Sequence, residues 1–532
     1  MRFRRLMVLM AAALAACGAR AATPDKPNIV VFLVDDMGWQ DTSVPFWEER
    51  TPFNDHFRTP NMERLTAKGI KFTNARAHAV CSPTRTSIMT GQSPIRHHVT
   101  NWTLRTDEET SREGGPTGPP PQWRREGIQA GETTVAQCLR EAGYRTIHAG
   151  KAHWGAVGTS GSDPRNLGFD VNIGGHSAGA PASYQGKKNF GNHENSKDQN
   201  LFAVPGLEAY HGKDIHLTDA ITAEARKAVA SAVDDGKPFY LYMAHYAVHT
   251  PIEPHGRFMP HYQGRNYTGT EIDIPKVEEE YASMIEGMDA SLGEILDMLE
   301  SLGVAKDTIV FFTSDNGGLS AHARGTTPMG TGLNTHCWPL KAGKGSAYEG
   351  GTRVPFLAAW AQPAADNAFQ SALPIPAASS SPQPVISEDL FPTLLGIAGV
   401  GEMLPRDYPV DGQDIRPWLT QSAIDLDRPL YFHYPHVWGP EGPGYQPHSA
   451  AVFGEWKVIH YYNDNSWELY NLKEDLGEKD NLAKAQPERL ANLAARLHEH
   501  LTELGAQWPV LREGGAEVPM KLPGLLKDNT QR

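Results

Sequence analysis

The chain has 532 residues, of which 40% are hydrophobic and 21% are charged, and its formal net charge is -13. This composition is typical of a globular protein, and the length allows roughly two to four domains with sizeable cores. The acidic balance argues against a nucleic-acid-binding protein and against attraction to anionic membranes, since both need a basic surface. It does not exclude an anionic substrate, because a few cations in a cleft outweigh the global charge locally.

Residues 1–22 predict an export signal that is removed from the mature protein. An arginine-containing start precedes an apolar run over residues 6–16, which is too short to span a bilayer. Two processing sites compete. Residues 14–17 resemble a bacterial lipobox, which would attach a lipid to Cys17, whereas residues 19–21 resemble an ordinary cleavage site. Both predict an exported protein, in the bacterial periplasm or on the outer membrane as a lipoprotein, that contacts a membrane only through such an anchor.

Several apolar runs end abruptly in polar clusters. They are residues 29–34 before Asp35 and Asp36, residues 144–149 before Lys151, residues 239–243 before His245 and His249, and residues 308–313 before Asp315 and Asn316. Continuous runs of β-branched and aromatic residues predict strands buried on both faces. Helical patterns lie between them, so we expect an α/β fold with a large mixed, mostly parallel sheet sandwiched by helices. Ligands bind beyond the carboxyl ends of such strands, where these polar residues fall.

The clearest helix has an apolar stripe over residues 281–299 and a plausible stop at Gly303. Residues 105–127 are rich in Pro and Gly and predict a surface loop, and residues 361–384 predict an exposed insertion. After about residue 428 the pattern changes to short strands at 450–453, 457–462 and 467–472, followed by an amphipathic helix. We therefore expect a main domain over 23–428 and a smaller C-terminal subdomain over 429–532, an antiparallel sheet with one helix.

Four cysteines are too few for a disulfide framework and match no zinc site. Cys138 and Cys337 read as buried thiols, although a bridge between them stays open. Cys81 begins a Cys-Ser-Pro-Thr-Arg segment in which Pro83 suits the first turn of a helix. A helix N-terminus beside Arg85 favours anions, and predicts a depressed thiol pKa and a reactive cysteine. From the residues alone, a reactive and a structural Cys81 are equally open.

The segment Cys81-x-Pro83-x-Arg85, followed by Thr90-Gly91, resembles the motif of the type I sulfatases, the arylsulfatase-like family of the alkaline phosphatase superfamily. The resemblance implies sulfate-ester hydrolysis, with Cys81 oxidised to formylglycine by a maturation enzyme. In that family the aldehyde hydrates to a geminal diol. One hydroxyl attacks sulfur and the alcohol leaves, and the second lets the hemiacetal collapse and expel sulfate. Because a thiol lacks this last step, the resemblance makes conversion of Cys81 a requirement.

The resemblance also implies a metal site. Residues 27–38 are similar to the family's opening strand, which ends in the metal-binding Asp35 and Asp36, and Asp315-Asn316-Gly-Gly resembles the second metal pair. With formylglycine 81 these residues would form an all-oxygen ligand set, which suits one Ca²⁺, or Mg²⁺, rather than zinc. A single Asp-Gly cluster after a strand is usually a turn. Two such clusters together with the cysteine motif favour a metal site.

Further residues match elements of the same family. Gly150-Lys151-Ala152-His153 resembles the Gly-Lys-x-His element, which implies that Lys151 and His153 hydrogen-bond the formylglycine and the sulfate. His249, in a His-x-Pro element, would assist the leaving group, with His245 as a weaker candidate that is more often structural. Lys344, in a lysine- and glycine-rich segment over 340–355, would bind sulfate. We expect Arg85 to join the two lysines in stabilising charge on the sulfuryl oxygens.

The sequence leaves two other classes of function open as alternatives. A phosphodiesterase or phosphonate hydrolase of the same superfamily commonly has two metals and a Ser or Thr nucleophile, whereas this chain has Cys81 and an Asp-Asn pair. A non-catalytic glycan-binding protein would be expected to have lost Cys81 or the acids. Neither loss is present, so the sequence favours an exo-acting sulfatase of a sulfated glycan, with a sulfated galactose or N-acetylgalactosamine as the suggested unit. Loop residues that could contact sugar are Trp102, His176, His336, His436 and Trp438.

Mass spectrometry of the Cys81 peptide tests the required oxidation. In protein from a host that has a formylglycine-generating enzyme, we expect this peptide to be lighter by the conversion of a thiol to an aldehyde. Protein that retains an unmodified thiol and still has full activity would contradict the mechanism.

Overall fold

The structure is a computed structural model that describes residues 25–192, 200–266, 276–320, 324, 336–439 and 444–524. The expected export signal at 1–22, with its Cys17, lies outside these residues. Within the described chain, no helix combines the length and apolar character needed to cross a membrane.

The main sheet has eight strands in the order β10-β2-β9-β8-β1-β7-β5-β6. Strand β9 runs antiparallel to both of its neighbours, and every other pair in the sheet is parallel. The strands are β1 (Asn28–Val34), β2 (Ile70–Phe72), β5 (Arg145–Gly150), β6 (Val171–Ile173), β7 (Phe239–Ala244), β8 (Thr308–Ser314), β9 (Phe356–Trp360) and β10 (Ser379–Ser381). The expected mixed, mostly parallel sheet is confirmed.

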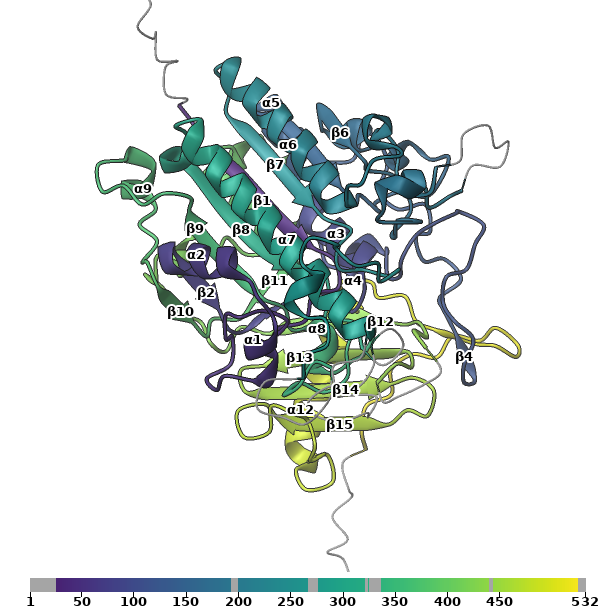
Figure 1. Ribbon diagram of the computed structural model, residues 1–532. Coiled ribbons are helices and arrows are strands. Elements are labelled where there is room, and N and C mark those ends of the chain that lie inside the picture. Colours follow the sequence, from purple (N-terminus) through teal and green to yellow (C-terminus); the bar gives the residue numbers. More distant parts are fainter. Residues whose placement is uncertain are drawn as a thin grey trace, which may run out of the picture.

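The apolar run in β1 is continuous because both faces of the sheet are covered by helices (Figure 1). Val30 and Phe32 pack with α6 (Leu217–Asp234) and α7 (Lys276–Ser301). Val31 and Leu33 point to the other face, where they pack with α3 (Cys81–Thr90), α5 (Val135–Glu141) and α10 (Leu390–Ile397). Alternate side chains of one central strand therefore serve two separate cores.

The C-terminal part forms a four-stranded antiparallel sheet, below the main sheet in Figure 1. It contains β12 (Leu430–Tyr434), β13 (His448–Phe453), β14 (Trp456–Tyr461) and β15 (Trp467–Asn471). The leucine stripe of α12 (Pro487–Glu503) packs on one face of this sheet. The other face packs against Tyr348 and Ile386 of the main part. The expected small sheet with one helix is confirmed, whereas the boundary at residue 428 stays a prediction.

The remaining elements are short. The α-helices are α1 (Pro52–His56), α2 (Pro60–Lys68), α4 (Pro94–His97), α8 (Glu349–Thr352), α9 (Ala368–Ala372) and α11 (Arg416–Leu419). The 3₁₀ helices are η1 (Ser160–Ser162), η2 (Pro164–Leu167), η3 (Gly186–Gly191), η4 (Glu208–Tyr210), η5 (Met259–His261), η6 (Ala305–Asp307), η7 (Ser387–Asp389) and η8 (Gly401–Met403). Two short ladders pair β3 (Ala75–Arg76) with β11 (Val385–Ile386), and β4 (Thr117–Gly118) with β16 (Val510–Leu511).

Two segments expected to be plain surface loops contribute to sheets instead. Residues 361–384 contain α9 and then β10, which adds an edge strand to the main sheet beside β2. Residues 105–127 contain β4, which pairs with the far C-terminal strand β16. Both strands are only two or three residues long, so their sequences carry too little periodicity to reveal them.

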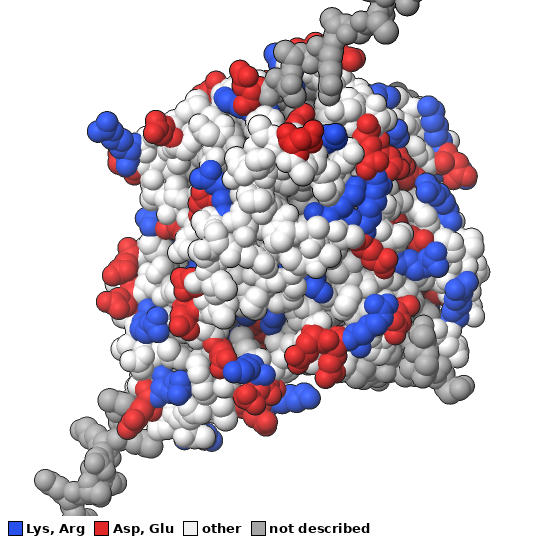
Figure 2. Space-filling model, turned by 90° about the vertical axis from the view of Figure 1, so that its left-hand side faces the viewer, with Lys and Arg blue, Asp and Glu red and all other residues white. Residues whose placement is uncertain are grey.

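Opposite charges are interspersed on the face of the molecule drawn in Figure 2. Pairs such as Arg64 with Asp297 at 2.5 Å are partly exposed, and such pairs contribute little to stability. The buried pairs are different. Lys457 of β14 contacts Glu349 and Glu478, each at 3.0 Å, and all three side chains are at most 1% exposed. Glu349 also forms an ion pair with Arg76, whose Nη2 lies 2.7 Å from Glu349 Oε2. This cluster connects the small sheet to the main part of the molecule.

Replacing Lys457 by Met should destabilise the protein, because it leaves two buried carboxylates without their shared cation. We expect a loss of about 3–5 kcal/mol in the free energy of unfolding, measured by urea denaturation. The matched control is Lys473→Met, since Lys473 is 64% exposed and pairs with a half-exposed Glu455; its cost should stay below about 1 kcal/mol. Similar costs for the two variants would contradict a structural role for the cluster.

Candidate active site

The candidate site lies where β1 and β8 end side by side. Val34 and Ser314 are register partners in these parallel strands, so the acids that follow them emerge together. The Asp36 backbone N–H donates to Asp315 Oδ1 (3.2 Å), and Asn316 Nδ2 donates to Asp36 Oδ1 (2.8 Å). Asp36 has a left-handed backbone (φ 64°), which turns the chain out of the strand. Four predicted metal ligands are thus held in one buried cluster.

Cys81 is the first residue of α3, and its side chain comes within 4.8 Å of carboxylate oxygens of Asp35 and Asp315. The residue is only 3% exposed. Burial raises the pKa of the Cys81 thiol, although Lys151 and Lys344 act in the opposite direction. The expected depressed pKa is therefore wrong: loss of water and the neighbouring carboxylates outweigh the helix N-terminus and the cations. This position is a poor one for a reactive thiolate.

Lys151 and Arg85 form a cationic layer behind the acids. Lys151 Nζ lies 2.7 Å from Asp35 Oδ2 and 3.9 Å from Asp315 Oδ2. Arg85 Nε donates to Asp315 Oδ2 (2.8 Å), and its Nη1 donates to the Lys151 carbonyl (2.9 Å). Both side chains are fully buried. Arg85 and Lys151 together hold the pKa of Asp315 below its usual range against the opposing effect of burial.

Lys344 approaches the cluster from the other side, with its Nζ 2.6 Å from Asp36 Oδ1. Burial alone would raise the pKa of Asp36, but Lys344 and Lys151, with a hydrogen bond from Asn316, outweigh it and hold that pKa well below its usual range. The ring of Trp438 lies 5.3 Å from Lys344 Nζ. A Cβ added to Gly345 would sit 2.1 Å from the Trp438 ring, and Gly345 has φ +86°. Only glycine accommodates this backbone and this aromatic neighbour together.

The two histidines predicted to be catalytic are neutral imidazoles. His249 Nδ1 donates to the Thr250 carbonyl (2.7 Å), which leaves Nε2 as the acceptor 3.6 Å from Asp36 Oδ2. Burial, with Lys344 adding to it, lowers the pKa of His249 to about 3. His153 Nε2 donates to the Thr103 carbonyl (2.8 Å), and burial followed by Lys151 lowers the pKa of His153 well below its usual range.

A cavity of about 200 Å³ opens onto this cluster. It is lined by Cys81, Trp102, Arg112, His153, Gly179, Ala180, Phe202, His249, Thr250, Leu319, Lys344 and Trp438. Four of the six residues predicted to be catalytic therefore reach the cavity wall, while Arg85 and Lys151 lie behind it. Of the five residues suggested for sugar contact, the two tryptophans line it, whereas His436 is fully buried and its Nε2 lies 2.9 Å from Thr100 Oγ1.

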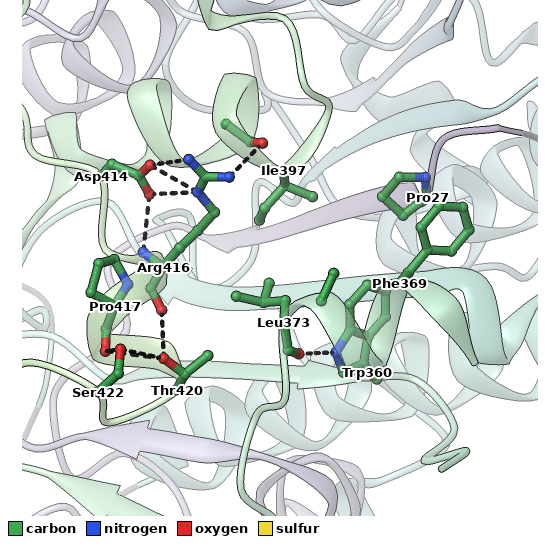
Figure 3. Close-up of a pocket in the computed structure, with 12 residues that line it drawn as sticks. Pro27, Trp360, Phe369, Leu373, Ile397, Asp414, Arg416, Pro417, Thr420 and Ser422 are labelled. Atoms are coloured by element: carbon green, nitrogen blue, oxygen red, sulfur yellow. Dashed lines mark hydrogen bonds and ion pairs between the residues drawn. The ribbon is translucent and has the colours of Figure 1, made fainter. Parts of the chain in front are cut away.

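A second cavity of about 440 Å³ lies at the opposite ends of the strands, beside Pro27, which precedes β1 (Figure 3). The polar side chains that line this cavity form hydrogen bonds with one another or with nearby backbone carbonyls. Arg416 pairs with Asp414 and donates to the Gly396 carbonyl, and the Trp360 indole donates to the Leu373 carbonyl. This pairing leaves no reactive group facing the cavity among its described lining residues, so its larger volume does not make it the active site.

The donor set fits a hard cation. In the described part of the chain, Asp35 Oδ1, Asp36 Oδ2 and Asn316 Oδ1 are buried and lack any hydrogen-bond donor. Burial also raises the pKa of Asp35 well above its usual range, and Asp315 adds to the shift. Unsatisfied buried oxygens are costly, and a cation with oxygen ligands would satisfy all three.

Cys138, Cys337 and His245 have no part in the site. Cys138 and Cys337 are buried free thiols, so the two are not bridged. His245 Nε2 lies 2.8 Å from Ser291 Oγ in the core. Arg112 and Phe202 also line the cavity but were not selected from the sequence. They lie on loops whose sequences carry no recognisable motif, and only the fold brings them to the cavity. Thr250, the middle residue of the His-x-Pro element, lines it as well.

An acidic cluster at adjacent strand ends of a helix-covered mixed sheet, with a buried cysteine on a helix N-terminus, defines a hydrolase of the alkaline-phosphatase-like fold. Within that class, a family model described as Sulfatase matches residues 27–400, and the chain belongs to this family of sulfate-ester hydrolases. A second model, described as N-sulphoglucosamine sulphohydrolase, C-terminal, matches residues 344–507.

Two similar proteins are named as sulfatases of N-acetylgalactosamine. The chain is 30% identical to human N-acetylgalactosamine-6-sulfatase, with 85% of this chain and 75% of that protein covered. It is 28% identical to an N-acetylgalactosamine-6-O-sulfatase of Bacteroides thetaiotaomicron, with 89% and 92% covered. The crystal structure of Ps i-CgsB in complex with k-i-k-neocarrahexaose has a TM-score of 0.65 at 26% identity, with 90% of this chain and 93% of that chain covered.

Removing divalent cations should lower thermal stability, since three buried oxygens of the acidic cluster would lose their partner. After treatment with a chelator, we expect added Ca²⁺ or Mg²⁺, at about 100 times its dissociation constant, to raise the melting temperature by about 2–3 °C. Asn316→Ala should reduce this rise, whereas Asn166→Ala, at an exposed asparagine that is distant in the sequence, should retain it. A melting temperature that neither cation changes would show that the cluster holds no such ion.

Proposed function

We propose that this sulfatase removes sulfate from a sulfated glycan, acting on a terminal 6-O-sulfated N-acetylgalactosamine or galactose. The observation that carries the proposal is the cavity over Cys81, which combines Lys344 with two tryptophans. Lysine suits a sulfate group, and tryptophan faces suit the apolar face of a sugar ring. A volume of about 200 Å³ lies below that of pockets for larger ligands and favours a single terminal sugar. The names of two relatives support the choice of sugar.

The reaction needs an oxygen nucleophile at position 81. Formylglycine there would supply a hydrated aldehyde, whose hydroxyl can attack sulfur and whose second hydroxyl allows sulfate to leave. The raised pKa of the encoded thiol fits a residue that is a precursor rather than the nucleophile itself. His153 Nδ1 is buried with no partner in the described chain, and it would accept a hydrogen bond from such a hydroxyl.

One divalent cation, Ca²⁺ or Mg²⁺, would be held by Asp35, Asp36, Asp315 and Asn316 together with residue 81. It would supply positive charge for the sulfuryl oxygens. Lys344 adds to that charge from the cavity wall. Lys151 and Arg85 act indirectly, because their ion pairs keep Asp35 and Asp315 in place and balance their charge. The acids can then remain close together without water.

His249 would assist the leaving oxygen. Its Nε2 is an acceptor in the unliganded arrangement, because Nδ1 is committed to the Thr250 carbonyl. An anionic sulfate bound beside Lys344 would raise the proton affinity of this imidazole by Coulomb attraction. His249 would then carry the proton that the departing alkoxide needs.

This function requires two partners, a maturation enzyme and a glycan substrate. A formylglycine-generating enzyme must oxidise Cys81, and the sulfated glycan must reach the protein. Export guided by residues 1–22 places it in the periplasm, or on the outer membrane through Cys17, where such glycans arrive from outside.

A sulfate-release screen over defined sulfated sugars tests the proposal. We expect the matured enzyme to release sulfate from 6-sulfated N-acetylgalactosamine or galactose in preference to the 4-sulfated isomers. Cys81→Ala should lower kcat/KM by roughly 10³-fold or more, because it removes the nucleophile. The matched control Cys138→Ala, at a buried thiol of α5, should retain activity. Release of phosphate from phosphodiesters, with none of sulfate from sugars, would refute the proposal.

A further inference from the structure

We propose that Arg112 forms a second anion-binding subsite at the exposed edge of the active-site cavity. Its ligand would be a carboxylate or a second sulfate on the sugar that adjoins the sulfated unit. The inference rests on the proposed glycan sulfatase function and deepens it, since it assigns a residue that selects polyanionic glycans.

Lys344 and Arg112 line the cavity, and of these two cations only Arg112 has no ion pair with a described residue. Lys344, the other basic side chain there, is paired with Asp36 at 2.6 Å. The Arg112 guanidinium is exposed and has no hydrogen bond or ion pair with any described residue. In the described lining of the cavity there is also no carboxylate, although the protein carries a net charge of -13. An unpaired guanidinium beside an acid-free cavity wall attracts an anion.

The backbone of Arg112 is fixed against the small sheet. Its N–H donates to the Val437 carbonyl (2.9 Å), and the Val437 N–H donates to Ser111 Oγ (3.0 Å). Arg512 Nη2 donates to the Arg112 carbonyl (3.3 Å). Trp438, which follows Val437, packs over Gly345 beside Lys344. The backbone of this arginine is therefore held in position relative to one of the two aromatic walls, so that only its side chain must be ordered on binding.

The two cations of the cavity wall differ in their exposure to solvent. Lys344 is 2% exposed and reaches the acidic cluster, so it serves the sulfate that is cleaved. Arg112 is exposed, and a sugar ring between Trp102 and Trp438 would present its neighbour to solvent on this side. A guanidinium binds carboxylate and sulfate with two parallel hydrogen bonds. A terminal monosulfated sugar fills only the inner position, whereas a polyanionic oligosaccharide would occupy both.

The test compares three disaccharides in which 6-sulfated N-acetylgalactosamine is joined to a different neighbour. The neighbours are a uronic acid, the same sugar with its carboxylate reduced to an alcohol, and a neutral sugar that carries a second sulfate. We expect the wild-type matured enzyme to prefer at least one charged disaccharide over the reduced one. Arg112→Gln should lower kcat/KM for the preferred substrate about tenfold, mainly through KM, and remove the preference.

The controls separate this inference from the function on which it rests. Arg105→Gln changes an exposed arginine of the same loop that does not line the cavity, and it should keep the preference. Arg112→Lys should retain part of it. Preference for the uronic acid identifies a carboxylate as the ligand, and preference for the doubly sulfated substrate identifies a second sulfate. Sulfate release without any preference, or an equal loss on all three substrates in Arg112→Gln, overturns the subsite alone. No release from any sugar overturns the glycan function and the subsite together.

Discussion

Three carboxylates share one buried space at the ends of β1 and β8, and the rest of the site depends on how their charge is balanced. Parallel pairing of these two strands forces the acids together. Lys151 and Arg85 neutralise them from behind, and Lys344 does so from the cavity side. Three buried oxygens still lack a donor. A buried site whose acceptor oxygens outnumber its donors suits a cation with oxygen ligands, and that cation and Lys344 together could receive a sulfate group.

The same principle operates at the junction of the two sheets. Glu349 lies in the same segment as Lys344, and it is buried with Arg76 and Lys457. These ion pairs connect the loop that carries Lys344 to β14 of the small sheet. Trp438, from the loop after β12, in turn lies over Lys344. The small sheet therefore supplies one wall of the active site and also fixes the loop beneath that wall.

Residues with strong local signals were predictable from the sequence, and residues defined by tertiary contacts were not. The strands β1, β5, β7 and β8 were evident as buried apolar runs, and the acids were evident because they end those runs. The short strands β4 and β10 were missed since two or three residues have no periodicity. The pKa of Cys81 was predicted in the wrong direction, because the helix N-terminus is a local feature whereas burial and the nearby carboxylates come from distant parts of the chain. Arg112 was missed for the same reason: contacts with residues distant in the sequence, such as Val437, bring its loop to the cavity.

Gly345 constrains how related sequences can diverge. Its backbone has φ +86° and its missing side chain leaves the space that the Trp438 ring occupies, although 93 positions separate the two residues. A larger residue at 345 would expel the tryptophan, while a smaller one at 438 would leave a gap over Lys344. Neither position can change alone without altering the surface that a sugar meets. Within this family, the two positions should therefore vary as a pair, and each pairing would mark a group of enzymes with its own shape of binding surface.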